Sequence, residues 1–488
     1  MYMMENVFIS ALVEHAATRG NDVACHFLDA EGEITSSLTF DQLLQTREMA
    51  KHILTYCQPG DRALLIYENG AEFMRSFLAC LQAGVIAVPA YPPRKNQNVD
   101  RLRSLITDAE CSVVLTVGKL AALFADRVKH EPAIKNIPVC ATDELDDRSP
   151  DITLPQITPE TVAFLQYSSG STGDPKGVMV NNYNLVQNIR RIEKAFEQDQ
   201  NSRIVSWLPN FHDMGLIAGF LMPVYLGAQT FLMSPTTFLN RPVIWLKAVA
   251  KYKATMSGAP NFAYDLCVDR IKDEDLKDID LKGWKVAFCG AEPIRAETFT
   301  RFSERFSTCG FGSNSLFPCY GMAEATLFIS GPGMGVGATV MPVEKKAFSQ
   351  NRAVVAKPQE AQQQLVSSGI LWLGDEIAIA DPQTRQHLPD CEVGEVWFRS
   401  PSVAQGYWKN PELTEYAFNA HLSCSNEGPF MRTGDLGFMR DGMLYITGRL
   451  KDIIIIRGGN FYPQDIEKAV SDVDEALAEN SSAAFSVD

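Results

Sequence analysis

Residues 162–180 read VAFLQYSSGSTGDPKGVMV, and this stretch holds the strongest signal for both the fold and the function of the chain. Apolar runs flank the loop SSGSTGDPKG, which predicts a strand, a loop of small residues and a second strand. Backbone N–H groups, hydroxyls and one cation, Lys176, can together hold a polyphosphate. The loop differs from a Walker A motif, because Gly177 follows Lys176 and because Pro175 lacks an amide donor. The flanking strands argue against the alternative, a flexible surface loop.

The alternation of strands and helices extends from this loop in both directions. Residues 62–67 (RALLIY) predict a buried strand, residues 71–83 place apolar side chains on one helical face, and Gly84 predicts the end of that helix. The alternation returns between residue 162 and about residue 294. Repeated strand–helix–strand units predict an α/β fold with doubly wound sheets, in which helices cover both faces.

The pattern changes in the last third of the chain. Residues 331–366 interrupt the alternation, and their first residues, GPGMGVG, predict a mobile loop. Residues 367–449 predict a β-rich part, with Asp441 and Gly442 in a two-residue hairpin turn. Residues 450–488 predict one strand and one helix, a segment that is marginal as a free domain.

The composition excludes several classes of protein. Hydrophobic residues are 46% and charged residues 21% of the chain, which is typical of a globular protein with a large core. The net charge of −15 argues against nucleic acid and anionic membranes as partners. The 11 cysteines form no C-x-x-C pair, which predicts free thiols in a reducing, cytoplasmic compartment. No apolar run approaches the roughly 18 residues of a membrane span, so no stable membrane insertion is expected.

Four further clusters carry chemistry. In WLPNFHDMGL (residues 207–216), His212 and Asp213 lie between a strand and a helix start, where side chains can project into a cleft, although such a pair can also be purely structural. GAEP (residues 290–293) follows a strand, and its small residues allow a flat ligand to approach the backbone.

The other two clusters lie further along the chain. In CYGMAEAT, Tyr320 offers an aromatic face for a base and Glu324 a carboxylate for Mg²⁺, unless they are a core tyrosine and a surface glutamate. In RTGDL and GRLKD, Asp435 can accept hydrogen bonds from ribose hydroxyls and Arg449 can reach ribose or phosphate. With no nucleophile motif present, attack of a substrate group on a nucleotide phosphate is predicted.

Taken in this order, the motifs resemble the adenylate-forming superfamily, which includes acyl-CoA synthetases, luciferases and adenylation domains of peptide synthetases. LQYSSGSTGDPKGVMV, SWLPNFHDMGL, FCGAEPIR, PCYGMAEATL and GRLKDIIIIRGGNFYPQDIE are similar to the fatty acyl-AMP ligases. The resemblance runs from LTF at residues 38–40 to the final helix. It implies a large N-terminal adenylate-forming domain, residues 1–449, with doubly wound sheets and a small β subdomain. Residues 450–488 would begin a small C-terminal lid domain that is truncated.

The resemblance implies a reaction in two steps. A fatty acid carboxylate attacks the α-phosphate of ATP with Mg²⁺ and releases pyrophosphate, and the acyl group then passes to the phosphopantetheine thiol of an acyl carrier protein. The insertion at residues 331–366 favours a carrier protein over CoA. A fatty acyl-CoA synthetase of the same fold and a catalytically weak acyl-nucleotide binding module remain alternatives. Arg190, Arg191 and Lys194 form a candidate basic patch for the carrier, or a solvated helix face.

The resemblance also assigns roles to individual residues. It gives catalytic roles to His212, Lys176 and Glu324, metal binding to Glu324 and Thr172, and the hinge to Lys451. The acid would contact Asp213, Met214 and Phe262. The nucleotide would contact Ser169, Gly170, Ser171, Thr172, Gly173, Gly290, Ala291, Glu292, Tyr320, Gly321, Met322, Ala323, Asp435 and Arg449. The family's second catalytic lysine falls beyond residue 488, so adenylation by this chain is expected to be slower by about 10²–10³.

Overall fold

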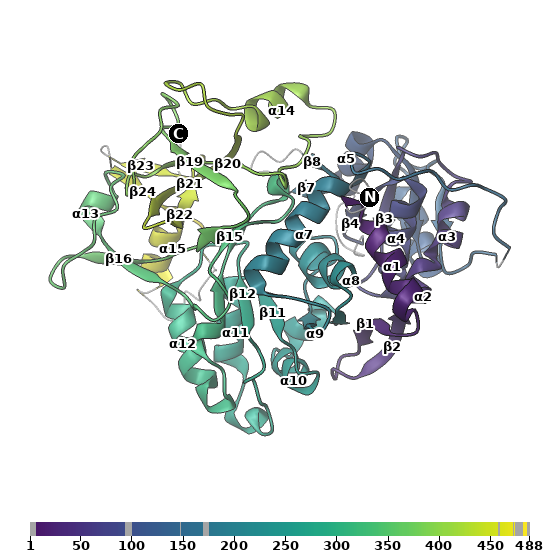
Figure 1. Ribbon diagram of the computed structural model, residues 1–488, viewed down its shortest axis with the longest axis horizontal. Helices are drawn as coiled ribbons and strands as arrows, with labels where there is room; N and C mark the ends of the chain where they lie inside the picture. Colours follow the sequence, from purple (N-terminus) through teal and green to yellow (C-terminus); the bar gives the residue numbers. More distant parts are fainter. Residues whose placement is uncertain are drawn as a thin grey trace.

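The computed structural model describes residues 6–92, 100–146, 148–168, 175–456, 459–471, 473 and 482–485. Up to β13 (Leu316–Pro318) the chain forms two large, mainly parallel sheets, and the residues after it form smaller antiparallel sheets (Figure 1). The predicted α/β fold, with doubly wound sheets and a small β part, is therefore confirmed.

The first large sheet contains the strands on both sides of the predicted phosphate loop. All of its neighbouring strands run parallel except β7 and β8, which pair antiparallel around that loop. The predicted helix is α4 (Ala71–Ala83), and Gly84, at a left-handed φ of 64°, ends it as expected. In spatial order the strands are β6 (Val139–Ala141), β5 (Cys111–Thr116), β3 (Arg62–Ile66), β4 (Ile86–Ala90), β7 (Val162–Ser168) and β8 (Lys176–Asn181).

The second large sheet is parallel except for the hairpin of β1 and β2 at one edge. In spatial order its strands are β13, β12 (Val286–Cys289), β11 (Met256–Ala259), β9 (Arg203–Ser206), β10 (Gln229–Leu232), β1 (Val23–Leu28) and β2 (Ile34–Thr39). The helices of both sheets are α1 (Phe8–Arg19), α2 (Phe40–Leu44), α3 (Thr46–Ile53), α4, α5 (Asp100–Ala109), α6 (Gly118–Val128), α7 (Asn182–Phe196), α8 (Met222–Leu226), α9 (Pro235–Asn240), α10 (Val243–Lys251), α11 (Asn261–Arg270) and α12 (Ala296–Phe306).

The remaining strands form antiparallel sheets. One contains β19 (Glu376–Ala380), β20 (Gly394–Arg399), β21 (Met431–Arg440) and β22 (Met443–Arg449); others pair β14 (Tyr320–Gly321), β15 (Phe328–Gly331) and β18 (Ile370–Leu371), β16 (Val340–Glu344) and β17 (Gln362–Val366), and β23 (Ile454–Ile456) and β24 (Gly459–Phe461). Asp441 and Gly442 join β21 to β22 with φ values of 52° and 74°, as a primed hairpin turn requires. The helices here are α13 (Lys345–Phe348), α14 (Pro411–Phe418) and α15 (Pro463–Ser471).

The segment predicted as an insertion contains regular structure. Strands β16 and β17 form a hairpin in which Val340 lies opposite Val366 and Glu344 lies opposite Gln362. The Glu344 carboxylate caps α13 by accepting hydrogen bonds from the backbone N–H groups of Lys346 and Ala347. Sequence periodicity missed these elements because they are short and half-exposed.

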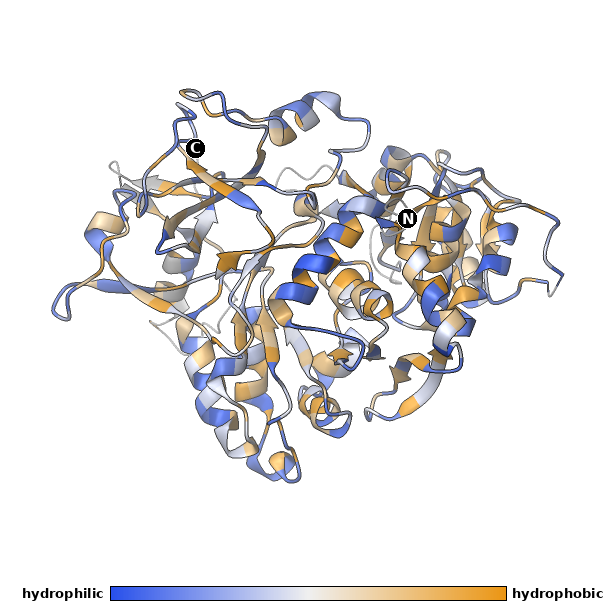
Figure 2. Cartoon of the chain, in the orientation of Figure 1, coloured by the Kyte–Doolittle hydropathy of each residue, from blue (hydrophilic) through white to orange (hydrophobic). Residues whose placement is uncertain are grey.

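The apolar residues are concentrated where the two large sheets and their helices meet. Figure 2 shows hydrophobic residues along the strands and mixed colouring around the outer helices. On α12, for example, Phe299, Phe302 and Phe306 are buried while the opposite face is polar. No helix within the described residues is both long and apolar enough to cross a membrane.

Candidate active site

The predicted phosphate loop is described only at its two ends. Ser169, Gly170, Ser171, Thr172 and Gly173 lie outside the described residues, so their predicted contacts with phosphate and metal remain predictions. The flanking strands are those expected, with Ser168 opposite Lys176 in the ladder. The Asn181 side chain at the end of β8 forms a capping box with Asn184, so the strand leads directly into α7.

The structure explains why glycine follows the loop lysine. A Cβ atom at Gly177 would lie 2.8 Å from Cζ of Tyr167, which is closer than real contacts allow. The hydroxyl of Tyr167 donates a hydrogen bond to Oδ2 of Asp108 at 2.6 Å, so its ring is held in place beneath β8. Packing between the two strands therefore requires glycine at position 177.

Glu324 and Lys176 meet at a residue that sequence analysis did not single out. The hydroxyl of Tyr407 donates a hydrogen bond to Oε1 of Glu324 at 2.8 Å. The ammonium of Lys176 lies 5.8 Å from the centroid of the same ring, within the range of a cation–π interaction. Burial, and then the charge of Glu324, raise the pKa of Tyr407, so its hydroxyl remains a neutral donor. Motif reading missed Tyr407 because no phosphate or metal chemistry distinguishes it.

Tyr320, Asp435 and Arg449 form a second cluster. The Tyr320 hydroxyl donates to Oδ2 of Asp435 at 2.6 Å, and Nε of Arg449 lies 3.5 Å from Oδ1 of the same carboxylate. Asp435 and Arg449 face each other across the β21–β22 hairpin, which explains their contact. Burial raises the pKa of Asp435 to about 6, although Tyr320 and Arg449 counteract it. The structure thus brings together three residues predicted to bind the nucleotide.

A buried ion pair between Arg432 and Glu395 supports the part of β21 just before Asp435. The carboxylate of Glu395 accepts hydrogen bonds from Nη2 of Arg432 at 2.6 Å, Nε1 of Trp397 at 2.9 Å and the backbone N–H of Gly434 at 3.2 Å. The Arg432 guanidinium also lies 4.3 Å from the centroid of the Tyr416 ring. Glu395 therefore holds the RTGDL part of β21 in place, and only the pairing of β20 with β21 could have indicated this.

GAEP lies beside Tyr320 because β12 and β13 are parallel neighbours. The backbone N–H of Cys319 donates to the carbonyl of Cys289 at 2.8 Å, and a Cβ at Gly290 would lie 3.0 Å from the carbonyl oxygen of Cys319. Ala291 adopts a left-handed φ of 69°, which a residue with a side chain rarely does. Gly290 and Ala291 thus form a tight bend at the carboxyl end of β12.

Glu292 and Phe262 are linked to each other. Oε1 of Glu292 accepts a hydrogen bond from the backbone N–H of Phe262 at 2.6 Å, in the first turn of α11. Burial raises the pKa of Glu292, while this N–H donor lowers it. The Phe262 ring packs edge-on against Trp207, with centroids 6.4 Å apart. Glu292 therefore positions the first turn of α11, and its contact with the nucleotide remains a prediction.

The predicted pair His212 and Asp213 stands at a helix start, as expected. Asp213 accepts a hydrogen bond from the backbone N–H of Met214 at 2.7 Å and caps the π-helix η2 (Met214–Leu221). Nδ1 of His212 lies 2.7 Å from Oδ1 of Asp213, and the His212 side chain is 51% exposed. The Asp213 charge raises the pKa of His212, although partial desolvation of the half-exposed ring opposes this effect. Met214 is buried, so it could contact the acid only as part of the wall of a binding pocket.

The turn before His212 is anchored to the other large sheet. Nδ2 of Asn69 donates to the carbonyl of Leu208 at 3.0 Å, and Oδ1 of Asn69 accepts from the N–H of Asn210 at 3.2 Å. Nε2 of Gln166 donates to the carbonyl of Phe211 at 3.0 Å. Because Gln166 lies on β7, two residues before Ser168, the turn carrying His212 is tied to the strand that enters the phosphate loop.

The other predicted residues have structural surroundings as well. A Cβ at Gly321 would lie 1.9 Å from the carbonyl oxygen of Leu327, so only glycine fits there. Met322 contacts the Tyr320 hydroxyl through its sulfur at 3.9 Å, and Ala323 is buried. Lys451 is exposed in the turn between β22 and β23.

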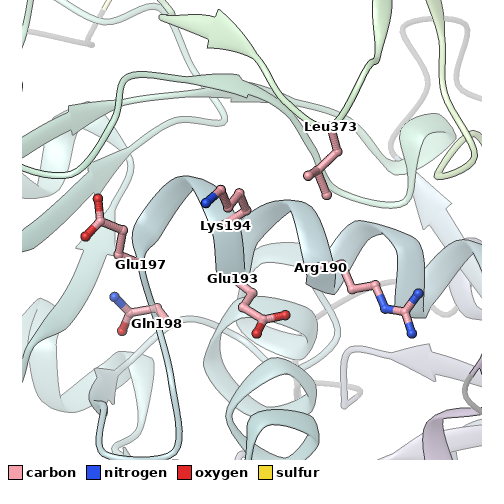
Figure 3. Close-up of a pocket in the computed structure, with 6 residues that line it drawn as sticks. All are labelled: Arg190, Glu193, Lys194, Glu197, Gln198 and Leu373. Atoms are coloured by element: carbon pink, nitrogen blue, oxygen red, sulfur yellow. The ribbon is translucent and has the colours of Figure 1, made fainter.

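The predicted basic patch on α7 does not include Arg191. Arg191 is buried and forms a bidentate pair with Asp375, at 2.7 Å and 2.6 Å. Arg190 and Lys194 line a pocket together with two acidic residues, Glu193 and Glu197, so the surface is mixed in charge (Figure 3). The sequence placed three basic residues close together, but the helix directs one of them inward.

A single carboxylate such as that of Glu324 can bind a metal ion whose other ligands come from a bound phosphate. Within the described part of the chain, no group of three or more His, Cys, Asp or Glu side chains could hold a metal ion. Mg²⁺ in proteins usually takes one or two carboxylates and completes its coordination with substrate phosphates and water. The donor set therefore fits Mg²⁺ brought in with a nucleotide.

This combination of fold and site is typical of the adenylate-forming class of enzymes. The family model of the AMP-binding enzyme matches residues 12–408, and the chain belongs to this family.

Individual relatives agree with this assignment. The chain is 40% identical to the medium-chain-fatty-acid–[acyl-carrier-protein] ligase JamA of Moorena producens, over 95% of this chain and 80% of that protein. It is 34% identical to the medium-chain-fatty-acid–[acyl-carrier-protein] ligase TtuA of Teredinibacter turnerae, over 96% and 80%. The structure matches the fatty acyl-adenylate ligase of L. pneumophila, solved in complex with acyl adenylate and pyrophosphate, with a TM-score of 0.86, 39% identity and coverage of 99% and 84%.

Proposed function

We propose that the chain activates a fatty acid with ATP to give an acyl-AMP and pyrophosphate, and passes the acyl group to the phosphopantetheine thiol of an acyl carrier protein. The observation that carries this proposal is that Lys176, at the phosphate loop, and Glu324, the metal carboxylate, contact the same tyrosine. The two relatives named as fatty acid–carrier protein ligases support the choice of acid and acceptor.

The first step is a substitution at phosphorus. An oxygen of the fatty acid carboxylate forms a bond to the α-phosphorus, the bond to the bridging oxygen of the β-phosphate breaks, and pyrophosphate leaves with that electron pair. In this proposal Lys176 and the loop residues would hold the departing phosphates, and His212 would act where the carboxylate meets the α-phosphate. The protein contributes position and charge rather than a nucleophile.

The nucleotide base and sugar are held by the second cluster. Tyr320 would frame adenine together with Gly290 and Ala291, whose tight bend leaves room for a flat ring. Asp435 would accept hydrogen bonds from the ribose hydroxyls, with Arg449 beside it. Mg²⁺ at Glu324 would neutralise negative charge on the phosphates. The contacts of Tyr320, Asp435 and Arg449 with one another support these proposed roles.

The acyl acceptor and the compartment are also part of the proposal. The hairpin of β16 and β17 occupies the segment 331–366 that favours a carrier protein over CoA. All 11 cysteines are free, and most of them are buried, which supports a reducing compartment such as the cytoplasm. We place the division between the large domain, residues 1–449, and the lid segment, residues 450–488, at the end of β22, with Lys451 as the hinge.

Pyrophosphate release and product mass together test the proposal. The protein is incubated with ATP, Mg²⁺ and a mixture of fatty acids, and either a phosphopantetheine-loaded carrier protein or CoA is added. We expect pyrophosphate release that requires a fatty acid, and a carrier protein whose mass increases by one acyl group. Acyl-CoA as the main product would instead indicate a CoA synthetase. Bound acyl-AMP with no turnover would indicate a binding module.

A further inference from the structure

Residues 402–408, SVAQGYW, run beside the strand that leaves the phosphate loop, and no role was predicted for them. The backbone N–H of Met179 donates to the carbonyl of Gly406 at 2.9 Å, and the N–H of Trp408 donates to the carbonyl of Gly177 at 2.7 Å. These are antiparallel contacts with β8, immediately after Lys176. We call residues 402–408 the strap, because they connect β8 to the turn that carries Glu324.

The other end of the strap holds the turn of Glu324. The backbone N–H of Ala404 donates to the carbonyl of Glu324 at 2.9 Å, and Oγ1 of Thr326 donates to the carbonyl of Ser402 at 2.7 Å. Thr326 has a φ of 72°, which is strained for a β-branched residue. Such a conformation persists only where the surroundings enforce it, so the strap fixes the shape of this turn.

Tyr407 lies at the centre of the strap and is clamped on several sides. It is 8% exposed, its N–H donates to Oγ1 of Thr414 at 2.9 Å, and its ring packs edge-on against Phe418 with centroids 5.3 Å apart. Its hydroxyl is bonded to Oε1 of Glu324, and its ring faces the Lys176 ammonium. Backbone and side chain thus both connect the two charged groups.

We propose that Tyr407 is a positioning residue that holds Glu324 ready for a divalent cation and sets its distance from Lys176. The inference rests on the proposed function, because it assumes that Glu324 binds Mg²⁺ with a nucleotide. By occupying Oε1, the hydroxyl selects one orientation of the carboxylate and leaves Oε2 for the cation. Carboxylates that bind metals are commonly oriented by a neighbouring hydrogen bond, which raises metal affinity.

The test uses Tyr407→Phe, which removes only the hydroxyl and keeps the ring over Lys176. The chain offers a matched control in Tyr252→Phe. Tyr252 is also 8% exposed, donates its hydroxyl to the carbonyl of Gly32 at 2.8 Å and has Lys251 5.4 Å from its ring centroid, but it lies away from the site. Both variants lose one buried hydrogen bond, so a general loss of stability should affect them alike.

The main readout is binding rather than turnover. Binding of a fluorescent ATP analogue is titrated with Mg²⁺ at fixed analogue concentration, and thermal unfolding is measured in parallel. For Tyr407→Phe we expect the Mg²⁺ concentration for half-maximal binding to rise on the order of tenfold, as for loss of a hydrogen bond to a charged group. Analogue binding without Mg²⁺ and the KM for fatty acid should stay unchanged, and Tyr252→Phe should match the wild type in all three.

Two results would overturn the inference while leaving the proposed function intact. One is an unchanged or lowered Mg²⁺ requirement in Tyr407→Phe, which would mean that the hydroxyl is irrelevant or competes with the cation. The other is an equal rise in both variants, which would reduce the effect to stability. A wild-type protein that neither binds the analogue nor releases pyrophosphate would overturn both proposals together.

Discussion

The site contains two tyrosine–carboxylate pairs that look alike and are built differently. Tyr320 donates to Asp435, whose other oxygen faces the guanidinium of Arg449. Tyr407 donates to Glu324, and the cation beside it, Lys176, lies over the ring instead of on the carboxylate. Within the described residues, Glu324 forms no ion pair with a basic side chain. The two carboxylates thus differ in their neighbours: Asp435 faces a guanidinium, whereas the hydroxyl of Tyr407 is the group that contacts Glu324.

Breaking the buried ion pair of Glu395 and Arg432, which supports the strand that carries Asp435, should have the largest effect on stability. Replacing Glu395 with alanine leaves Arg432 buried without its partner, which should lower the free energy of unfolding by about 3–5 kcal/mol. Urea denaturation measures this change. As a control, Glu376→Ala removes the exposed partner of Arg399 and should cost no more than about 1 kcal/mol. Equal losses in the two variants would contradict the role given to the buried pair.

The Glu324 pair should dominate the chemical step. Glu324→Gln keeps the shape but removes the charge, so the rate of pyrophosphate release should fall by about 10²–10³. Rates are measured at saturating ATP over a range of Mg²⁺ concentrations. Glu274→Gln, at a residue that is 73% exposed, serves as the surface control. Full activity of Glu324→Gln at ordinary Mg²⁺ would assign the metal to other groups.

The Asp435 pair should affect nucleotide binding more than the chemical step. Asp435→Asn replaces two acceptor positions with one, so the KM for ATP should rise by about 10–100-fold with a smaller change in kcat. Comparison of ATP with its 2′-deoxy and 3′-deoxy forms locates the effect, because the variant should discriminate less against the deoxy nucleotides. Unaltered discrimination would mean that Asp435 does not contact the ribose.

The smallest expected effect is the response of the Asp435 pair to pH. Burial raises the pKa of the Asp435 carboxyl group to about 6. The charged form, which can accept two hydrogen bonds, therefore prevails above this pH and is lost below it. ATP affinity should therefore be constant above about pH 7 and fall as the pH decreases through 6. Binding titrations between pH 5 and 8 measure this, and the fall near pH 6 should be smaller in Asp435→Asn, in which only the other groups of the site, such as His212, still titrate. A flat profile in the wild type would contradict the raised pKa.

Local patterns predicted the parts of this molecule that local physics determines. The helix at residues 71–83, its end at Gly84 and the hairpin turn at Asp441 and Gly442 all appear as expected, because periodicity and positive φ are local properties. The parallel pairing of β12 and β13, which local patterns did not predict, brings GAEP next to Tyr320.

Long-range pairing explains what the sequence could not predict. Tyr407 is recognisable only once the strap is paired with β8, and a buried tyrosine in a loop carries no chemical signature. The sequence predicted Arg191 to be on a basic surface, because its buried partner, Asp375, is far away in the chain. Glu395 and Arg432 are likewise joined only across strands β20 and β21. Each of these residues depends on a contact that no local pattern encodes.

The turn that carries His212 has a mechanical consequence. This turn follows a strand of one large sheet. Its backbone forms three hydrogen bonds with two residues of the other sheet region, Gln166 on β7 and Asn69 in the loop after β3. A sliding motion of one sheet past the other would strain all three hydrogen bonds and shift the turn that carries the His212 imidazole. These three hydrogen bonds therefore resist independent movement of the two sheets at the turn that carries His212.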